Sequence, residues 1–207
     1  MVRPLDAGRL GAYLKAAYRS NRVTHFIMAL LTVITAPDPR LKVKAKPVAK
    51  VDKEIRKLMD DMLATMYRAP GIGLAAPQVG VAKRVIVLDI ADKEEPPAPM
   101  AMANPEILWK SDETVVWEEG CLSVPEHYAD VKRPAKVRVR YLDRENEIRE
   151  IEAEGLLATC IQHEMDHLEG VLFIDKISAL KRGIILRKLV KAKKAEPEPL
   201  PVRGQRR

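Results

Sequence analysis

The stretch His163-Glu164-Met165-Asp166-His167 decides how this chain is organised, because it places two imidazoles and a carboxylate within about one helical turn. Residues i and i+4 share one face of a helix, so His163 and His167 can bind a single ion through ring nitrogens. Glu164, one step round the helix, is placed to handle the proton of a water on that ion. An exposed polar face is the alternative, but unpaired His and Glu would be costly to bury among the apolar flanking residues Leu156, Leu157, Ile161, Leu168, Val171 and Leu172.

A catalytic ion of this kind needs three protein ligands and one open position, and the chain has two cysteines that could supply the third ligand. A thiolate binds borderline-soft divalent ions strongly. Cys160 shares the face of the two histidines but would have to reach along the helix axis, so buried packing explains it better. Cys121 lies in residues 118–125 (EEGCLSVP), where Gly120 frees the backbone and a bend can direct a thiol into a cleft. Alone, this segment is weak support for a ligand.

Residues 71–80 (GIGLAAPQVG) contain G-x-G-x-x-A, a variant of the dinucleotide-binding fingerprint. That fingerprint must follow a strand and open a helix, whereas this one follows a helical pattern and is interrupted by Pro77. No Gly-Lys-Ser/Thr follows, which excludes a phosphate-binding P-loop. What remains is a glycine-permissive segment that can approach an extended ligand closely and ends in the side-chain amide of Gln78.

Three segments together resemble the signature motifs of the peptide deformylase family, in the same order and spacing. They are residues 71–78 (GIGLAAPQ), 119–123 (EGCLS) and 162–170 (QHEMDHLEG), and the resemblance runs from about Ile34 to Lys176. Members of this family hydrolyse the N-formyl group from the initiator methionine of newly made bacterial and organellar proteins and release formate. The resemblance therefore implies a metal-dependent hydrolase acting on formyl-methionyl nascent peptides.

The resemblance also assigns the chemistry residue by residue. Cys121, His163 and His167 correspond to the metal ligands, with water in the fourth position. Glu164 corresponds to the general acid/base that takes the proton of the water and delivers it to the departing amine. The side-chain amide of Gln78 and the backbone N–H of Leu122 correspond to the donors that stabilise the tetrahedral oxyanion.

Substrate binding is expected to depend on the backbone, since the enzyme must accept every chain that begins with formyl-methionine. Ile72, Gly73, Glu119 and Gly120 correspond to positions that pair with the extended peptide as a strand would. The wall of the methionine pocket is expected to include Ile72, Tyr128, Thr159, Cys160 and His163. A bulky aliphatic residue is common where this chain has Thr159, whose hydroxyl could narrow or polarise the pocket.

The identity of the metal does not follow from the ligands, because two imidazoles and a thiolate suit Fe(II), Zn(II), Ni(II) and Co(II) alike. The resemblance favours Fe(II) as the native ion. Other sequence features agree with a cytoplasmic bacterial enzyme: the two cysteines suggest a reducing compartment, and no apolar run is long enough to span a membrane.

The charge divides the chain into three parts. Residues 1–27 carry five basic and one acidic side chain, a net of +4; residues 28–180 carry 21 and 26, a net of −5; residues 181–207 carry ten and two, a net of +8. We expect a catalytic domain over 28–180, followed by a basic amphipathic helix over 181–194 and a Pro- and Arg-rich disordered tail. The helix can simply pack on the domain or can also bind ribosomal RNA or protein near the peptide exit, as in bacterial relatives.

Residues 1–27 form an extension, because the family usually begins near what is here Met28. Five basic residues and a single Asp6 resemble an organellar transit segment, which would make the protein organellar. A start codon assigned too far upstream explains the extension equally well, with Met28 as the true initiator.

Hydrophobic periodicity completes the expected fold. Ile55, Met59, Met62 and Met66 recur at helical spacing and predict an amphipathic N-terminal helix over 51–68. Strands are expected at 84–90, 115–124, 137–141 and 147–153, with a surface loop at 92–100 and the metal-binding helix at 156–168. The prediction is an α+β fold with mainly antiparallel strands around a central metal-binding helix, plus N-terminal and C-terminal helices.

Three rival functions remain open at this stage. A conventional zinc peptidase would share His163, Glu164 and His167, but no histidine follows to serve as a third ligand. An inactive deformylase relative would be expected to have lost a ligand, Gln78 or Glu164. A purely RNA-binding module would explain the basic ends but leave the three motifs without a purpose.

Overall fold

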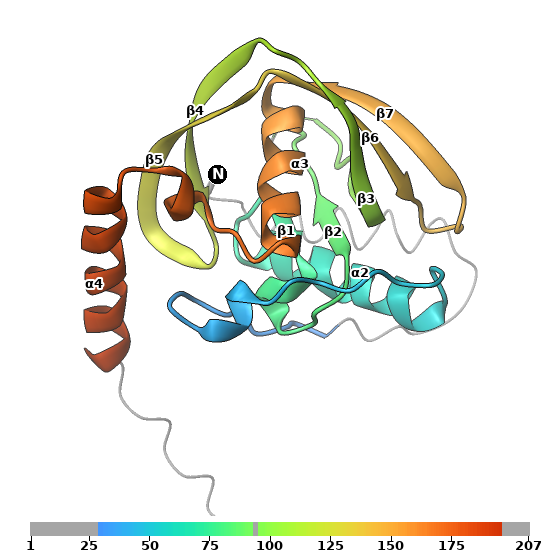
Figure 1. Cartoon of the computed structure of the whole chain (residues 1–207). Coiled ribbons are helices and arrows are strands. Elements are labelled where there is room, and N and C mark those ends of the chain that lie inside the picture. The colour runs from blue at the N-terminus through green and yellow to red at the C-terminus, as the bar shows by residue number, and fades with distance from the viewer. Residues whose placement is uncertain (1–28, 93–94, 196–207) are drawn as a thin grey trace, which may run out of the picture.

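Helix α3 (Gly155–Leu168) runs through the middle of the molecule, between a β-hairpin on one side and a curved sheet on the other (Figure 1). The computed structural model describes residues 29–92 and 95–195, and the expected 1–27 extension and the tail beyond 195 lie outside them. The five-stranded sheet has the order β1-β2-β3-β6-β7, and β4 and β5 form the separate hairpin. All pairings between named strands are antiparallel, so the predicted α+β class is confirmed.

The strands and short helices have the following bounds: β1 Gly73–Ala75, β2 Val85–Leu88, β3 Met100–Lys110, β4 Thr114–Cys121, β5 Val124–Pro134, β6 Lys136–Leu142 and β7 Ile148–Glu154, with the 3₁₀ turns η1 Pro39–Lys42, η2 Ala76–Val79 and η3 Phe173–Lys176. The strands predicted near 84–90, 137–141 and 147–153 are present with small shifts at their ends. The predicted 115–124 strand was wrong at its end: β4 stops at Cys121, and Leu122 and Ser123 form a turn before β5.

The sequence prediction missed β1, β3 and β5. Strand β3 contains Asn104, at φ +49°, and Pro105, which lies within a register shift between Ala103 and Glu106. Proline donates no ladder hydrogen bond and is tolerated at such bulges, so the strand continues through a turn-like sequence. β5 begins and ends near prolines and has no sustained apolar alternation.

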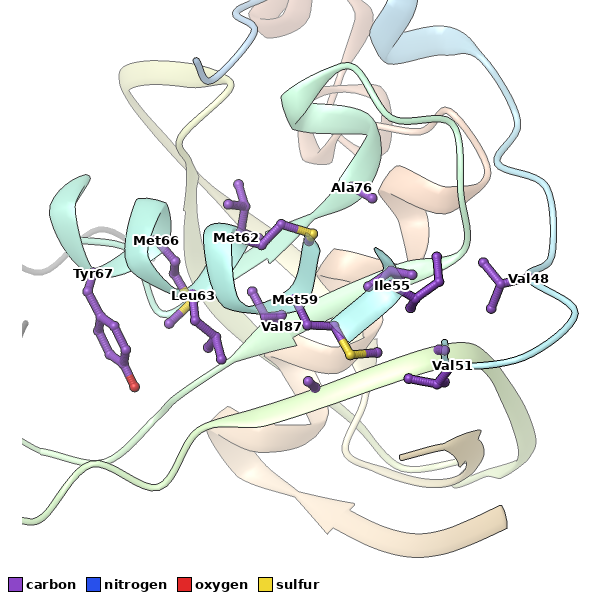
Figure 2. Close-up of a cluster of buried hydrophobic side chains, with 14 residues drawn as sticks. Val48, Val51, Ile55, Met59, Met62, Leu63, Met66, Tyr67, Ala76 and Val87 are labelled. Carbon is purple, nitrogen blue, oxygen red and sulfur yellow. The ribbon is translucent and has the colours of Figure 1, made fainter. Parts of the chain in front are cut away.

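Helix α2 (Lys53–Arg68) packs its apolar face on the sheet, as predicted from its periodicity. The side chain of Asp52 caps its start by accepting a hydrogen bond from the Ile55 N–H at 3.0 Å. Figure 2 shows Ile55, Met59, Met62 and Met66 directed into a cluster that includes Val87 of β2. Met59, Met62 and Met66 are fully buried, which makes this cluster a structural support for β1 and β2.

Helix α4 (Ala179–Ala195) forms the expected C-terminal helix and lies at one side of the molecule (Figure 1). Ile185 and Leu189 are buried against the domain, whereas Leu180 and Ile184 are exposed. Asp175 of η3 holds the start of α4, because its carboxylate accepts from Arg182 at 2.8 Å and also pairs with Lys42 of η1. Within the described residues, no helix has the length and apolar character needed to cross a membrane.

Candidate active site

A cleft with about 450 Å³ of space, partly open to solvent, lies between three segments that are far apart in sequence. One set of lining residues is 71–73 with Gln78, a second is 117–122 of β4 and its turn, and a third is one face of α3. The first two sets are called the walls of the cleft below, and the α3 face its floor. The two family motifs on the walls and the one on the helix therefore meet at a single place. The residues of α3 that line it are Leu156, Thr159, Cys160, His163 and Glu164.

Cys121 and His163, which line this cleft, come together with His167. Their candidate ligand atoms all lie within 4.8 Å of one another, and the Sγ of Cys121 is 3.2 Å from Nε2 of His167. All three residues are buried. The β4–β5 register changes abruptly between Gly120, opposite Tyr128, and Cys121, opposite Val124, and this irregularity turns the thiol toward α3. The donor set of one sulfur and two imidazoles fits a divalent ion such as zinc or iron.

A buried ion-pair network orients His163. Glu119 Oε2 accepts the Nδ1 proton of His163 at 2.8 Å, which leaves Nε2 free to act as a ligand. Arg133 of β5 donates hydrogen bonds from Nε and Nη2 to the same carboxylate, and its Nη1 donates to Asp166 Oδ2 at 2.7 Å. Lys176 also pairs with Asp166, at 3.1 Å. Burial alone would raise the pKa of Glu119, but the hydrogen bonds from Arg133 and His163 outweigh it and lower this pKa to about 2.

Burial shifts the pKa of each ionisable group in the cluster toward its neutral form, as expected for a buried site without a cation. Burial lowers the pKa of both His163 and His167, so both rings are neutral and able to ligate. Burial, with the nearby Glu164, raises the pKa of the Cys121 thiol to about 12. Burial likewise raises the pKa of Glu164 to about 8. A divalent cation at the triad would favour the charged thiolate and carboxylate, so the residues present fit a metal ion.

Glu164 lies in the same cleft and is 4% exposed. Its Oε2 is one of the buried side-chain atoms without a hydrogen-bond partner among the described residues. Its carboxylate also lies against Gly73, where an added Cβ would overlap Oε1. Glycine at position 73 therefore lets β1 approach the carboxylate closely.

Gln78 is held rigidly beside the triad. Its Oε1 accepts from the backbone N–H of Ala75 at 2.7 Å, and its Nε2 lies 3.1 Å from Ser123 Oγ and 3.4 Å from Cys121 Sγ. Leu122 lies in the turn that follows β4 and lines the same cleft. The residues of the two predicted oxyanion donors therefore both line the cleft, Gln78 in one set of lining residues and Leu122 in the other.

The predicted peptide-binding positions divide between the two walls. Ile72 and Gly73 line the cleft at the start of β1, and Glu119 and Gly120 line it from β4. Glu119, expected to contribute through its backbone, also directs its carboxylate into the network around His163.

Tyr128 does not belong to the residues that line the cleft. Tyr128 pairs with Gly120 across the hairpin and is 47% exposed as a residue. Its ring covers the face of Gly120, where an added Cβ would lie 2.6 Å from it. Cross-strand pairing with the small glycine explains this placement.

Thr159 and Cys160 line the cleft as expected and are buried. The thiol of Cys160 is 3.6 Å from the carbonyl oxygen of Ile72 and is not part of the cysteine–histidine cluster, which agrees with the packing interpretation. Sequence reasoning missed Trp117, Ser123, Arg133 and Asp166. Trp117 had a usable signal, because it alternates with Glu119 and Cys121 on one face of β4.

Comparison with known proteins identifies the family. Residues 30–183 match the family model described as Polypeptide deformylase. The chain is 60% identical over 174 residues to a peptide deformylase of Methylocella silvestris, which covers 83% of this chain and 89% of that protein. The chain belongs to the peptide deformylase family. A deformylase of Phenylobacterium zucineum is also 60% identical, over 168 residues that cover 81% of this chain and 99% of that protein.

Solved structures agree with this assignment. A peptide deformylase from Ehrlichia chaffeensis superposes with a TM-score of 0.77 at 40% identity, covering 80% of this chain and 98% of that one. The same organism's enzyme in complex with actinonin gives a TM-score of 0.77 at 43% identity, over 82% of this chain and all of that one. As a peptide deformylase, the protein is a metal-dependent hydrolase that removes the N-formyl group from nascent polypeptides, as the motifs predicted.

Proposed function

We propose that Cys121, His163 and His167 hold one divalent ion, natively Fe(II), at which the formyl group of a nascent chain is hydrolysed. The observation that supports this proposal best is that the three candidate ligand atoms lie within 4.8 Å of one another, beside a cleft that Glu164 also lines. Zn(II), Ni(II) and Co(II) satisfy the same ligands, and the family resemblance supports iron. When bound, such an ion supplies a water of lowered pKa and polarises the formyl oxygen.

Glu164 acts as the general acid/base in this proposal. Its carboxylate takes a proton from the attacking water as the new C–O bond forms, and delivers it to the nitrogen as the C–N bond breaks. The products are formate and a chain with a free amino group. The support is its burial in the cleft, with an oxygen that has no partner among the described residues.

Gln78 and Leu122 stabilise the oxyanion that forms when the formyl carbon is attacked. The Gln78 amide is already fixed by Ala75 and Ser123, so little reorganisation is needed. One of its N–H groups must exchange its partner, Ser123 Oγ or Cys121 Sγ, for the oxyanion. Losing one such donor typically lowers the rate on the order of a hundred- to a thousandfold.

The substrate binds in this proposal as an added strand between Ile72–Gly73 and Glu119–Gly120, with its first side chain directed toward the α3 floor. Main-chain bonding gives affinity without reading sequence, as a general deformylase requires. In this proposal Tyr128, whose ring lies against Gly120 from the paired strand, borders the bound chain rather than the first side chain.

Formate release tests the enzymatic part of this proposal. Anaerobically prepared protein is expected to release formate from formyl-Met-Ala and to leave the unformylated dipeptide intact, with Glu164→Ala nearly inactive. Cleavage of the unformylated peptide, or equal activity of Glu164→Ala, would contradict it. Metal analysis of the same preparation identifies the ion, and iron is expected.

The C-terminal part, residues 181–207, is proposed to bind the ribosome, while 28–180 form the catalytic domain in the bacterial cytoplasm. On α4, Ile185 and Leu189 face the domain, whereas Arg187, Lys188 and Lys191 are exposed. The double variant Arg187→Glu/Lys191→Glu keeps the packed face and should lose ribosome co-sedimentation at low salt. Unchanged co-sedimentation would remove this proposal and leave the catalytic one intact.

A further inference from the structure

Three buried side-chain atoms have no hydrogen-bond partner within the part of the chain that the structure describes, and all three lie on α3. They are Oε2 of Glu164, Nδ1 of His167 and the hydroxyl oxygen of Thr159. The first two belong to the proposed catalytic centre. The third is not explained by the hydrolysis itself, although Thr159 is only 4% exposed and lines the substrate cleft.

A threonine inside a helix normally satisfies its hydroxyl on the helix backbone, and this protein has such a case in α2. Thr65 Oγ1 donates to the carbonyl oxygen of Asp61 at 2.7 Å, and it also accepts from the Leu31 N–H at 2.9 Å. Thr159 makes neither kind of bond. Because an unpaired buried hydroxyl is costly, its retention in the wall of a binding cleft points to a partner that arrives with the ligand.

The position of Thr159 suggests where that partner would be. Leu156, Thr159, Cys160 and His163 follow the i, i+3, i+4, i+7 spacing of one helical face and together form the floor of the cleft. Leu156 offers only hydrocarbon, and the Cys160 thiol already approaches the Ile72 carbonyl at 3.6 Å. The Thr159 hydroxyl, which is covered in the structure, is therefore the unpaired polar group on this part of the floor that a rotation about χ1 can direct toward the first side chain of a substrate.

We propose that Thr159 donates a hydrogen bond to an acceptor atom on the first side chain of the substrate, and so distinguishes sulfur-containing side chains from hydrocarbon ones. This inference rests on the proposed function. A thioether is a weak acceptor and a sulfoxide oxygen a much stronger one, so formyl-methionine sulfoxide chains join the substrate class. Threonine has two accessible χ1 rotamers in a helix, which lets the covered hydroxyl turn toward an occupant of the cleft.

The test is a series of three dipeptides that differ only in acceptor strength: formyl-norleucyl-Ala, formyl-methionyl-Ala and formyl-methionine-sulfoxide-Ala. The isosteric variant Thr159→Val removes the hydroxyl. We expect kcat/KM for the sulfoxide to fall about five- to tenfold and for methionine about twofold, with norleucine unchanged. Thr159→Ser keeps the hydroxyl, so it should restore the differences in kcat/KM among the three dipeptides.

A matched control separates this effect from a general change in pocket shape. Cys160→Ala alters the neighbouring floor residue and is expected to change all three substrates by one common factor. If Thr159→Val also changes all three by a common factor, or changes none, the proposed hydrogen bond is absent. If the unaltered protein releases formate from none of them, the proposed function fails instead, so the two failures are distinguishable.

Discussion

Helices α2 and α3 both bury polar side chains, but the two helices differ in whether those side chains have hydrogen-bond partners. In α2, Asp61 accepts from the Ala29 N–H at 2.9 Å and from Lys57 at 2.6 Å, and Thr65 bonds to Leu31 and to the helix backbone. In α3, three buried polar atoms have no partner among the described residues. Both helices pack on the same sheet, so burial alone does not explain the difference.

The contrast separates a helix that supports the fold from one that carries the chemistry. Polar groups that bind an ion, move a proton or meet a substrate must stay available, and this costs stability. We expect this loss of stability to be offset nearby, because Arg133, Glu119 and Asp166 form a hydrogen-bonded ion-pair network that reaches His163 on the same helix. Substitutions on the two helices should therefore have different signatures in activity and in stability.

The largest effect is expected for Glu164→Gln. The amide keeps the shape but cannot carry a proton between water and amine, so formate release should fall on the order of 10²- to 10⁴-fold. The free energy of unfolding should stay the same or rise, since no buried carboxyl remains to be desolvated. Parallel formate assays and urea denaturation check this, and a loss of stability equal to the loss of activity would place Glu164 with the structural residues of α2.

Arg133→Met should produce the largest loss of stability. It leaves the buried Glu119 carboxylate without its two-point partner and Asp166 with Lys176 alone, for which we expect about 3–5 kcal/mol. The double variant Arg133→Met/Glu119→Gln should recover part of this loss, because the unpaired charge is gone. A single-variant cost below about 1 kcal/mol in urea denaturation would show that the network does not compensate for the unsatisfied atoms.

A matched pair, Thr65→Val and Thr159→Val, compares the two helices most closely. Thr65→Val removes two hydrogen bonds and leaves the Leu31 N–H unpaired, so it should destabilise the protein by about 1–3 kcal/mol. Thr159→Val removes a hydroxyl that has no partner and should be neutral or slightly stabilising. Thermal or urea unfolding of both variants checks this, and equal costs would mean that the Thr159 hydroxyl is satisfied in solution.

The smallest effect concerns Asp175, whose ion pairs lie nearer the surface than those of Arg133. Burial would raise the pKa of Asp175, but hydrogen bonds from Lys42, Leu172 and Arg182 hold it below its ordinary value of 3.8. A carboxyl with a lowered pKa stabilises the fold above its ordinary value, and this contribution disappears as pH falls through the folded pKa. Asp175→Asn should therefore cost about 1 kcal/mol or less at pH 7 and nothing at a pH below the lowered pKa of Asp175. A cost that is independent of pH would contradict the role of the charge.

The sequence predicted the parts of this protein that depend on local pattern. The periodicity of Ile55, Met59 and Met62 defined α2, and the spacing of His163 and His167 placed both on one helical face. Strand β3 could not be predicted in this way, because Pro105 is accommodated by a bulge that only its partner β6 makes possible. Arg133 gave no signal either, since its partners Glu119 and Asp166 are 14 and 33 residues away and meet only through the fold.

For the candidate site, the sequence predicted that residues far apart in the chain lie together, which no local pattern shows. This was possible because three motifs that are weak alone were interpreted together. The sequence did not show which individual polar atoms have hydrogen-bond partners. Thr159 was noticed as a departure from the aliphatic residue common at its position, but only the structure shows that its hydroxyl differs from that of Thr65.

The central claim is that one sulfur and two imidazoles converge on a single ion, and anomalous diffraction from anaerobically prepared crystals tests it most directly. The account predicts one anomalous peak, at the iron edge, about 2.3 Å from Cys121 Sγ and about 2.1 Å from Nε2 of both His163 and His167. A peak bonded to the histidines alone, with the Cys121 sulfur beyond bonding distance, would contradict it.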